Sequence, residues 1–203
     1  GSTVQFAKEV GRKNKNSALG GLNLNGVKDS TFVVTANDSV KLDGALPNSQ
    51  GAGLFIGDGV TANFAKGGTI SNFTVTGVQF KGDSPSSVLK GFTIADNVYD
   101  GIQFGGQKYF GAVIADNTIQ GNSGFGIETM QATNGLTIRN NVIGTKGTSN
   151  EWGYTSGGPN AHGIVLAPGD YTATVIADNA IQYNRRDGIA APNGVQGVVI
   201  SGN

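Results

Sequence analysis

His162, the single histidine of the chain, and Asp187 are two residues that could carry out acid–base chemistry together. Each stands directly before a Gly-Ile pair, and Asp100 and Phe125 stand before the two earlier pairs. If these pairs mark equivalent points of a repeated structure, the residues before them form one row with a spacing of about 4.8 Å. The sequence therefore predicts that His162 and Asp187 are neighbours and can exchange protons with a substrate.

Charged residues near this pair widen the chemistry that it could support. Arg185 and Arg186 directly precede Asp187 and offer positive charge to a carboxylated sugar. Glycoside hydrolysis commonly needs two carboxyl groups separated by roughly 5–5.5 or 6.5–9.5 Å, and Asp187 could form such a pair with Glu151 or Glu128. The alternative is that the histidine is a satisfied turn residue and that both arginines are solvated.

The elements that position these residues belong to a repeat. The Gly-Ile pairs begin at positions 101, 126, 163 and 188, with intervals of 25, 37 and 25 residues. A second landmark is the Asn that ends Ile-Ala-Asp-Asn and related segments, at positions 97, 117, 141, 179 and 203, with intervals of 20, 24, 38 and 24. Two landmarks with matching spacing indicate a solenoid.

Apolar residues alternate around both landmarks, as in strands, and Gly, Asn and Asp separate them. A unit this short can bury its apolar side only by stacking on its neighbours. We therefore expect an all-β parallel β-helix with coils of about 20–25 residues. We assign residues 1–30 to an N-terminal segment or cap and residues 31–203 to the β-helix, which we expect to continue beyond Asn203.

The recurring Asn has a structural interpretation. At a corner between strands it tolerates the left-handed backbone conformation, and its amide can bond the equivalent Asn of the next coil. The preceding Asp96, Asp116 and Asp178 are expected to point outward. A calcium-binding turn is the alternative, although the known calcium β-roll pattern is missing and each turn supplies few oxygen ligands. Calcium is thus the one cofactor considered, and no metal ligands are assigned.

The 38-residue interval contains an insertion at residues 144–160 that includes the only tryptophan. Long loops on a regular scaffold commonly carry function. Trp152 and Tyr154 could stack on a sugar ring and hydrogen-bond its hydroxyl groups. The alternative is that Trp152 folds back over exposed coil edges.

These repeats resemble the right-handed parallel β-helix, pectin-lyase-like superfamily, in particular bacterial surface proteins and alginate epimerases. The resemblance implies a single-stranded right-handed β-helix and leaves the activity open, because the superfamily contains lyases, hydrolases, epimerases and adhesins. The segment from Gly124 to Gln131 is similar to the epimerase catalytic segment Tyr-Gly-Phe-Asp-Pro-His. Phe125, Glu128 and Met130 stand at the positions of its Tyr, Asp and His, so the groups needed for proton transfer are missing.

Composition narrows the partners. Fourteen basic and fourteen acidic residues cancel, which argues against nucleic acid, and no apolar run approaches the roughly 20 residues that span a bilayer. We expect an extracellular or cell-surface module that recognises a polysaccharide, with an acidic one as a candidate and Trp152, Tyr154, His162 and Asp187 as contacts. The alternatives are a structural or adhesin segment with protein or end-to-end partners, and a polysaccharide lyase or hydrolase.

Overall fold

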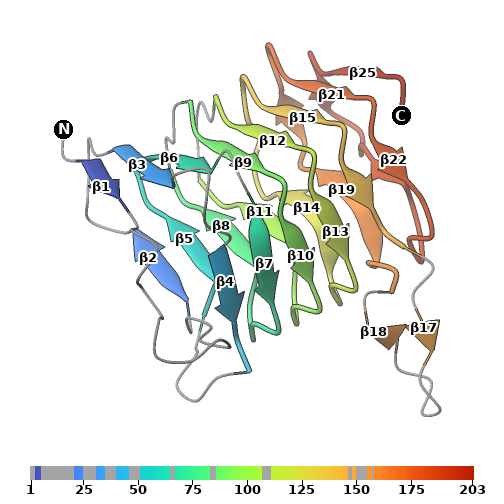
Figure 1. The fold of residues 1–203 in the computed structure, drawn as a ribbon. Coiled ribbons are helices and arrows are strands. Elements are labelled where there is room, and N and C mark those ends of the chain that lie inside the picture. The colour runs from blue at the N-terminus through green and yellow to red at the C-terminus, as the bar shows by residue number, and fades with distance from the viewer. Residues whose placement is uncertain are drawn as a thin grey trace.

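The computed structural model of the chain describes residues 3–5, 21–24, 31–34, 40–45, 51–64, 67–82, 86–106, 111–145, 148–149, 155–156 and 158–203. The elements within these residues are all β-strands, and they stack as successive coils (Figure 1). Each complete coil passes through three sheets in turn, and strands of successive coils pair in parallel. The expected all-β parallel β-helix is confirmed.

The three large sheets each collect one strand from successive coils. Sheet 1 contains, in spatial order, β1 (Thr3–Gln5), β3 (Thr31–Val34), β6 (Thr61–Phe64), β9 (Val88–Lys90), β12 (Val113–Ala115), β15 (Thr137–Arg139), β21 (Val175–Ala177) and β25 (Val199–Ser201). Sheet 2 contains β4 (Val40–Asp43), β7 (Gly68–Ser71), β10 (Thr93–Ala95), β13 (Thr118–Gln120), β16 (Val142–Ile143) and β22 (Ala180–Ile181). Sheet 3 contains β2 (Leu22–Leu24), β5 (Leu54–Ile56), β8 (Val78–Phe80), β11 (Ile102–Phe104), β14 (Phe125–Thr129), β19 (His162–Leu166) and β23 (Ile189–Ala190).

Two small sheets complete the strand inventory of the described residues. β20 (Gly169–Asp170) pairs in parallel with β24 (Val195–Gln196). β17 (Thr148–Ser149) pairs antiparallel with β18 (Thr155–Ser156), and both lie away from the stacked coils (Figure 1). The insertion inferred from the 38-residue interval therefore projects from the solenoid.

The sheets of the solenoid begin before residue 31, where the sequence placed the start of the β-helix. β1 and β2 both lie within residues 1–30, and they pair in register with β3 and β5. Part of the segment that was assigned to an N-terminal cap thus supplies strands to sheets 1 and 3.

The core consists of the inward-pointing residues of the three sheets, stacked coil on coil. Ile94, Ile119 and Ile143 form one such column in sheet 2 and are fully buried. In sheet 3 the rings of Phe80 and Phe104 stack at 4.7 Å and 12°. This distance matches the separation of neighbouring strands, so these two rings stack in register inside the coil.

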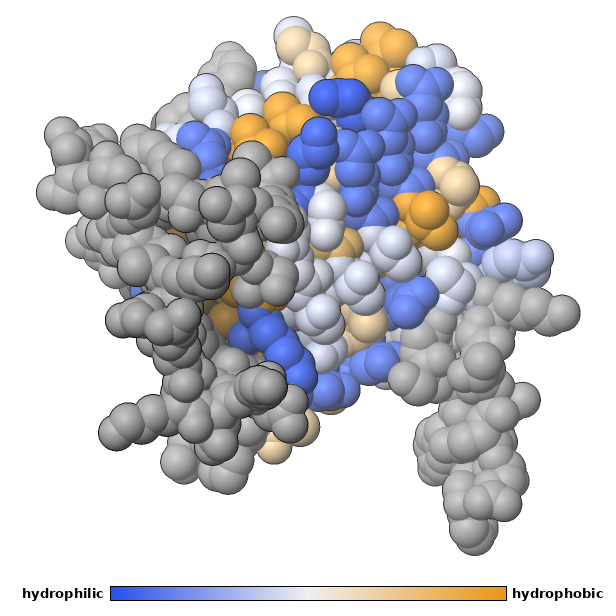
Figure 2. All heavy atoms as spheres, in the orientation of Figure 1, coloured by the Kyte–Doolittle hydropathy of each residue, from blue (hydrophilic) through white to orange (hydrophobic). Residues whose placement is uncertain are grey.

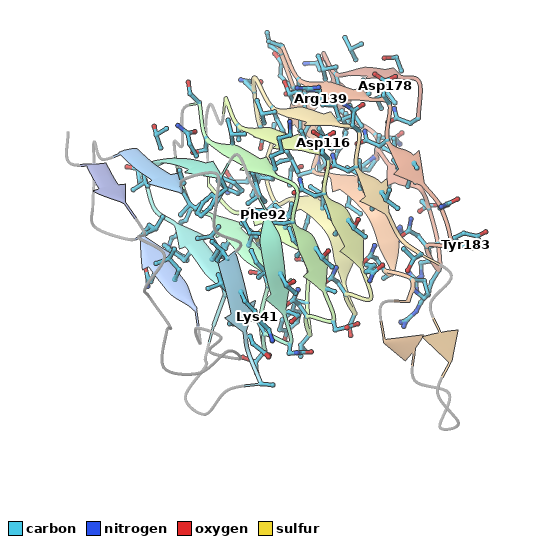
Figure 3. The ribbon with its side chains drawn as sticks, in the orientation of Figure 1. Lys41, Phe92, Asp116, Arg139, Asp178 and Tyr183 are labelled. Atoms are coloured by element: carbon cyan, nitrogen blue, oxygen red, sulfur yellow. The ribbon has the colours of Figure 1, made fainter. Side chains whose placement is uncertain are left out.

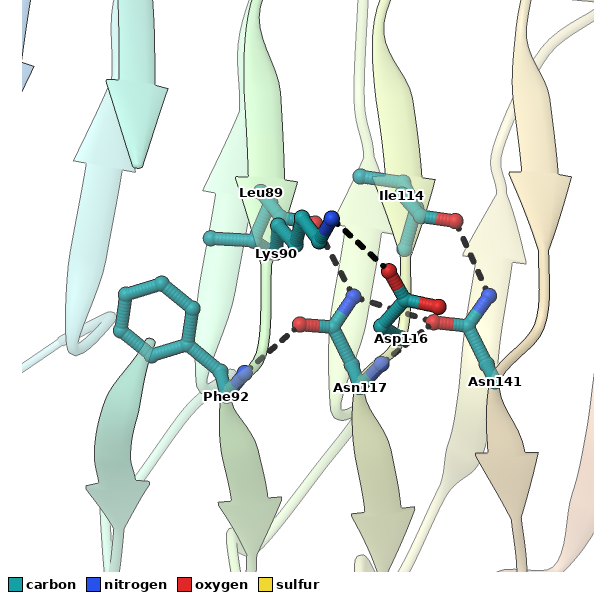
Figure 4. Close-up of polar contacts among 7 residues, drawn as sticks. All are labelled: Leu89, Lys90, Phe92, Ile114, Asp116, Asn117 and Asn141. Carbon is teal, nitrogen blue, oxygen red and sulfur yellow. Dashed lines mark hydrogen bonds and ion pairs between the residues drawn. The ribbon is translucent and has the colours of Figure 1, made fainter. Parts of the chain in front are cut away.

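Two columns of asparagine side chains run along the corners of the solenoid. The column between sheets 1 and 2 contains Asn117, Asn141, Asn179 and Asn203, linked by amide-to-amide bonds of 3.0, 2.9 and 2.7 Å. The column between sheets 2 and 3 contains Asn97, Asn122, Asn160 and Asn184. Most also donate to a carbonyl oxygen of the preceding coil, as Asn117 does to Leu89 (Figure 4). The predicted stacking of corner asparagines is confirmed.

The left-handed conformation lies one residue before the asparagine, and its assignment to the asparagine itself was wrong. Asp116, Asn140 and Asp178 have φ angles of 54°, 55° and 55°. Asp and Asn tolerate this region because their short side chains can bond locally. The sharp turn at this residue lets the next one point inward. Asp116 and Asp178 are exposed, as expected, whereas Asp96 is half-buried.

The first Ile-Ala-Asp-Asn segment lies at a different corner from the other two. Its isoleucine is in β10 of sheet 2, whereas Ile114 and Ile176 are in β12 and β21 of sheet 1. Asn97 therefore bonds to Asn122, and the 20-residue interval from Asn97 to Asn117 is not the length of a coil. Within each asparagine column the spacing is 24 or 25 residues, or 38 where the insertion occurs.

The outside of the corner between sheets 1 and 2 is hydrophilic. Asp116, Arg139 and Asp178 lie along it (Figure 3), and hydrophilic residues gather over this part of the surface (Figure 2). Lys90 pairs with Asp116 at 3.2 Å, but both side chains are well exposed, so this contact adds at most about 1 kcal/mol.

The two polar residues that end the second Ile-Ala-Asp-Asn segment should differ sharply in their effect on stability. Asn117→Ala leaves Phe92 N–H and the Leu89 carbonyl without their buried partner and breaks the bond to Asn141, so we expect a loss of about 2–4 kcal/mol. Asp116→Asn, the matched control, keeps a residue that tolerates positive φ and should cost less than about 1 kcal/mol. Urea unfolding of both variants measures the difference; equal losses would contradict the role of the asparagine column.

Candidate functional site

The outer face of sheet 3 carries two parallel rows of side chains. The turn row, from residues at the start of the strands or on the turn just before them, contains Asp100, Phe125, His162 and Asp187. The strand row, from outward-pointing residues of β8, β11 and β14, contains Gln79, Gln103 and Glu128, which pair in register. Within and between these rows, polar side chains of adjacent coils lie in contact.

The turn row has the order that the Gly-Ile spacing predicts. Phe125 N–H donates to Asp100 Oδ1 at 2.8 Å, and Phe125 pairs with His162 across β14 and β19. Their two rings meet edge to face at 5.3 Å. His162 Nδ1 then lies 3.1 Å from Asp187 Oδ2 in the next coil. The structure therefore brings the two predicted acid–base residues into contact.

The contact between His162 and Asp187 is close without being a well-aligned hydrogen bond. Within the described part of the chain, Nδ1 is buried and has no partner that satisfies hydrogen-bond geometry, despite its distance of 3.1 Å from the carboxylate. The imidazole is 14% exposed and the Asp187 side chain 64% exposed, so water screens one side of the pair. The attraction is therefore weak in the free protein.

The other residues predicted to bind substrate divide into two groups. Arg185 and Arg186 lie on the turn before Asp187, held by backbone bonds from their N–H groups to Asn160 and Ala161, with exposed side chains. Glu151, Trp152 and Tyr154 lie outside the described residues, between β17 and β18. Their part in a site stays a prediction.

A hydrogen-bonded chain links the two rows around Gln103. Gln79 Nε2 donates to Gln103 Oε1 at 2.8 Å, and Gln103 Nε2 donates at 3.1 Å both to Asp100 Oδ2 and to Glu128 Oε2. One amide thus holds two carboxyl groups from neighbouring coils close together. Glu128 does not reach Asp187, which precedes β23, two strands away in sheet 3. The carboxyl partner of Glu128 is Asp100.

The two carboxyl groups perturb each other because they are close and partly removed from water. Burial is the main cause that raises the pKa of Glu128 from 4.5 to about 7, and the charge of Asp100 raises it further. Burial also raises the pKa of Asp100, against the bonds from Phe125 N–H and Gln103. A hydrogen bond joins the two carboxyl groups and needs one proton between them. Near neutral pH this pair holds a proton that ordinary carboxyl groups would have lost.

Gly124 is required by the position of Asp100. A Cβ atom at Gly124 would lie 2.4 Å from Asp100 Oδ1 and about as close as 3.0 Å to the backbone of Tyr99. The glycine therefore leaves the space that the carboxyl group occupies. Tyr99 itself has a fixed backbone, because its carbonyl accepts from Gly124 N–H, while its side chain is 57% exposed. Tyr99 thus presents an exposed ring directly before Asp100 in the chain.

Sequence reasoning missed the pairing of Asp100 with Glu128, although the signal was present. Gln103 and Glu128 both stand two residues after the Gly of a Gly-Ile pair, so the repeat alone places them side by side. It placed Asp100 in the turn row as well. The missing element was the depth of Asp100, which is only 5% exposed and so turns its carboxyl group toward Gln103 and not toward solvent.

Neither a metal site nor a membrane span is found in the part of the chain that the structure describes. Its His, Asp and Glu residues form no group of three or more that could hold a metal ion. It also contains no helix long and apolar enough to cross a membrane. The calcium alternative therefore has no preformed ligand set among these residues.

Comparison with known families agrees with the coil geometry. Residues 13–156 match the family described as right handed beta helix region. The chain belongs to the right-handed β-helix family. Searches of curated proteins and of solved structures returned no match. Membership of the β-helix family fits a carbohydrate-active or structural module, and the finer likeness of the segment from Gly124 to Gln131 to alginate epimerases stays a prediction.

The carboxyl pair of this right-handed β-helix should make its stability depend on pH in a defined direction. Because the pKa of Glu128 is raised in the folded state, its contribution is complete below pH 4.5 and is lost as pH rises toward 7. Glu128→Gln keeps the bonds to Asp100 and Gln103 without the charge. We expect the variant to exceed the wild type by about 1–2 kcal/mol at pH 8, after discounting for partial exposure, with a smaller advantage at pH 5. Urea unfolding at both pH values measures this, and a pH-independent difference would contradict it.

Proposed function

We propose that this β-helix module recognises a polysaccharide along the outer face of sheet 3. The observation that carries the proposal is the hydrogen-bonded row from Gln79 through Gln103 to the pair of Asp100 and Glu128. These groups hold one another in place, so a ligand that binds them loses little additional side-chain entropy. Sugar hydroxyl groups both donate and accept hydrogen bonds, which suits a row of amides and carboxyl groups.

Aromatic rings beside this row support a sugar ligand. The side chain of Tyr99 is exposed next to Asp100, and Phe125 is half-buried between Asp100 and His162. An aromatic face packs on the C–H side of a sugar ring while the polar groups bond its edge. The strand spacing of about 4.8 Å also repeats these groups along the solenoid axis, as a linear polymer repeats its residues.

The sequence predicts that His162, Asp187, Arg185 and Arg186 contact the substrate, and this prediction fits the same face. His162 and Asp187 continue the turn row beyond Phe125, and both arginines follow on the adjoining turn. Trp152, Tyr154 and Glu151 lie outside the described residues, and their contribution to the same binding surface stays a prediction from the sequence. A glycan partner places the module outside the cell or on its surface, and this localisation is part of the proposal.

Binding to immobilised polysaccharides tests the proposal. We expect saturable binding to at least one member of a panel of glucans, galactans, mannans, xylans and their uronate counterparts. Tyr99→Asn should weaken this binding about fivefold to tenfold through loss of ring stacking. Tyr183→Asn is the matched control, because Tyr183 is equally exposed at 56% but points away from the solenoid (Figure 3) and has a positive φ that Asn tolerates. If no polysaccharide of the panel binds, the structural or adhesin alternative is favoured.

A second candidate function, hydrolysis or elimination of the bound glycan, is favoured by one observation. Asp100 and Glu128 form a carboxyl pair with one retained proton, and a pKa of about 7 suits Glu128 as a general acid. The two hydrogen-bonded groups are closer than the roughly 5–5.5 Å of glycosidases that use both, so Asp100 would serve to hold the proton on Glu128 and not as the second reacting carboxylate. We expect new reducing or unsaturated ends from the bound polysaccharide, formed at least about 100-fold more slowly by Glu128→Gln.

The same assay distinguishes catalysis by Asp100 and Glu128 from catalysis by His162 and Asp187, the pair that the sequence predicts. If His162→Ala or Asp187→Ala abolishes product formation while Glu128→Gln retains it, the reacting groups are His162 and Asp187. If the wild type releases no product from any polysaccharide that it binds, the module only binds its ligand.

A further inference from the structure

The charged groups on the outer face of sheet 3 are mainly acidic where its central strands meet. β11 contributes Gln103, β14 contributes Glu128, and the turn before β11 contributes Asp100. Among the described residues, the titratable or charged groups on the surrounding elements are Tyr99, His162, Asp187, Asp58, Lys81, Arg185 and Arg186. Lys81 follows β8 and is exposed, and the arginines lie on the turn before β23, so these three described cations stand at the edges.

Within the described residues, no cation is among the partners of the two central carboxyl groups. The partners of Asp100 are Phe125 N–H, Gln103 and Glu128, and the partners of Glu128 are Gln103 and Asp100. Each of these is a neutral dipole or the other carboxyl group. The strongest charge acting on Glu128 is that of Asp100, and it opposes ionisation. A third negative charge placed here would meet two like charges in a half-buried site.

Resting on the proposed function, we propose that the polysaccharide recognised by this face is uncharged, and that uronate chains are rejected when Asp100 and Glu128 are both ionised. The pair of arginines beside Asp187 suggested a carboxylated sugar from the sequence. In the structure they lie two strands beyond Glu128, at the edge of the face, with exposed and solvated side chains.

A neutral sugar satisfies this site better than an anion does. Its hydroxyl groups donate to carboxylate oxygens, which are strong acceptors, and accept from amide N–H groups. The Gln79 amide already donates to Gln103 and Gln103 to both carboxyl groups, so the acceptors are fixed in direction. A uronate carboxylate offers only acceptors. Its negative charge would be tolerated only if Asp100 and Glu128 together bound an additional proton.

Acidification should weaken the rejection of uronates in a defined range. Below pH 7 the pair of Asp100 and Glu128 carries one charge fewer, because the pKa of Glu128 is raised to about 7. A uronate carboxyl group has an ordinary pKa of about 3–4 and stays ionised in that range. The affinity for a uronate chain should therefore rise as pH falls from 8 to 5.5, and Glu128→Gln should remove most of this change.

Matched glycan pairs that differ only in charge test the inference. Homogalacturonan is used in its methyl-esterified and de-esterified forms, and glucan, mannan and xylan oligosaccharides are used with their uronate counterparts. Dissociation constants are measured at pH 5.5 and pH 8, with calcium and with chelator. Where one glycan of a matched neutral and uronate pair binds, we expect the neutral chain to bind at least about tenfold more tightly than its uronate counterpart at pH 8. Glu128→Gln should reduce this ratio of dissociation constants.

The outcomes separate this inference from the proposed function. If no chain of either charge binds, the proposed function fails, and this inference falls with it. If a uronate chain binds as tightly as its neutral partner at pH 8, or binds only with calcium, the inference is overturned while glycan recognition stands. A charge preference that Glu128→Gln leaves unchanged would also overturn it, because the selection would then arise elsewhere on the molecule.

Discussion

Parallel pairing of every coil with the next, at the spacing of neighbouring strands, is the constraint on which the structure depends. Because this spacing is about 4.8 Å in all three sheets, each inward residue stacks directly on the inward residue of the next coil. The isoleucine columns and the stacked rings of Phe80 and Phe104 satisfy this requirement. The insertion that carries β17 and β18 pairs with itself and projects from the coils, so it leaves this register intact.

The same constraint explains the asparagine columns. At a corner the backbone turns away from its neighbour strand, and buried N–H and C=O groups would lose their partners. A side-chain amide has one acceptor and two donors, so Asn117 can bond Phe92 N–H, the Leu89 carbonyl and Asn141 together. The amide thus replaces missing backbone hydrogen bonds, and its bond to the equivalent asparagine keeps adjacent coils in register. A coil can carry another residue at this corner position if the asparagine of the next coil accepts from its N–H. Phe92 is such a residue, because its N–H donates to Asn117 Oδ1.

On the outer face, fixed spacing turns a structural repeat into a chemical site. Two acidic residues on adjacent coils cannot separate without breaking the sheet, so their repulsion must be relieved by a bridging donor or by a shared proton. Gln103 provides the donor, and Gly124 leaves the space that Asp100 needs. The solenoid therefore holds a charge arrangement that would not persist between flexible surface side chains. Burial of Glu128, with the nearby charge of Asp100, raises the pKa of Glu128 to about 7, so the pair retains a proton near neutral pH.

The sequence by itself determined the parallel β-helix, the stacking of corner asparagines and the contact of His162 with Asp187. Each follows from spacing, because residues one coil apart must be neighbours once the coils stack. Only the tertiary structure decided that the first Ile-Ala-Asp-Asn segment occupies a different corner, that the left-handed residue precedes the asparagine, and that Asp100 pairs with Glu128. Identical short segments fit either corner, since both need a tight turn followed by an inward amide. The depth and pKa of a carboxyl group depend on side chains from other coils, and no local pattern records them.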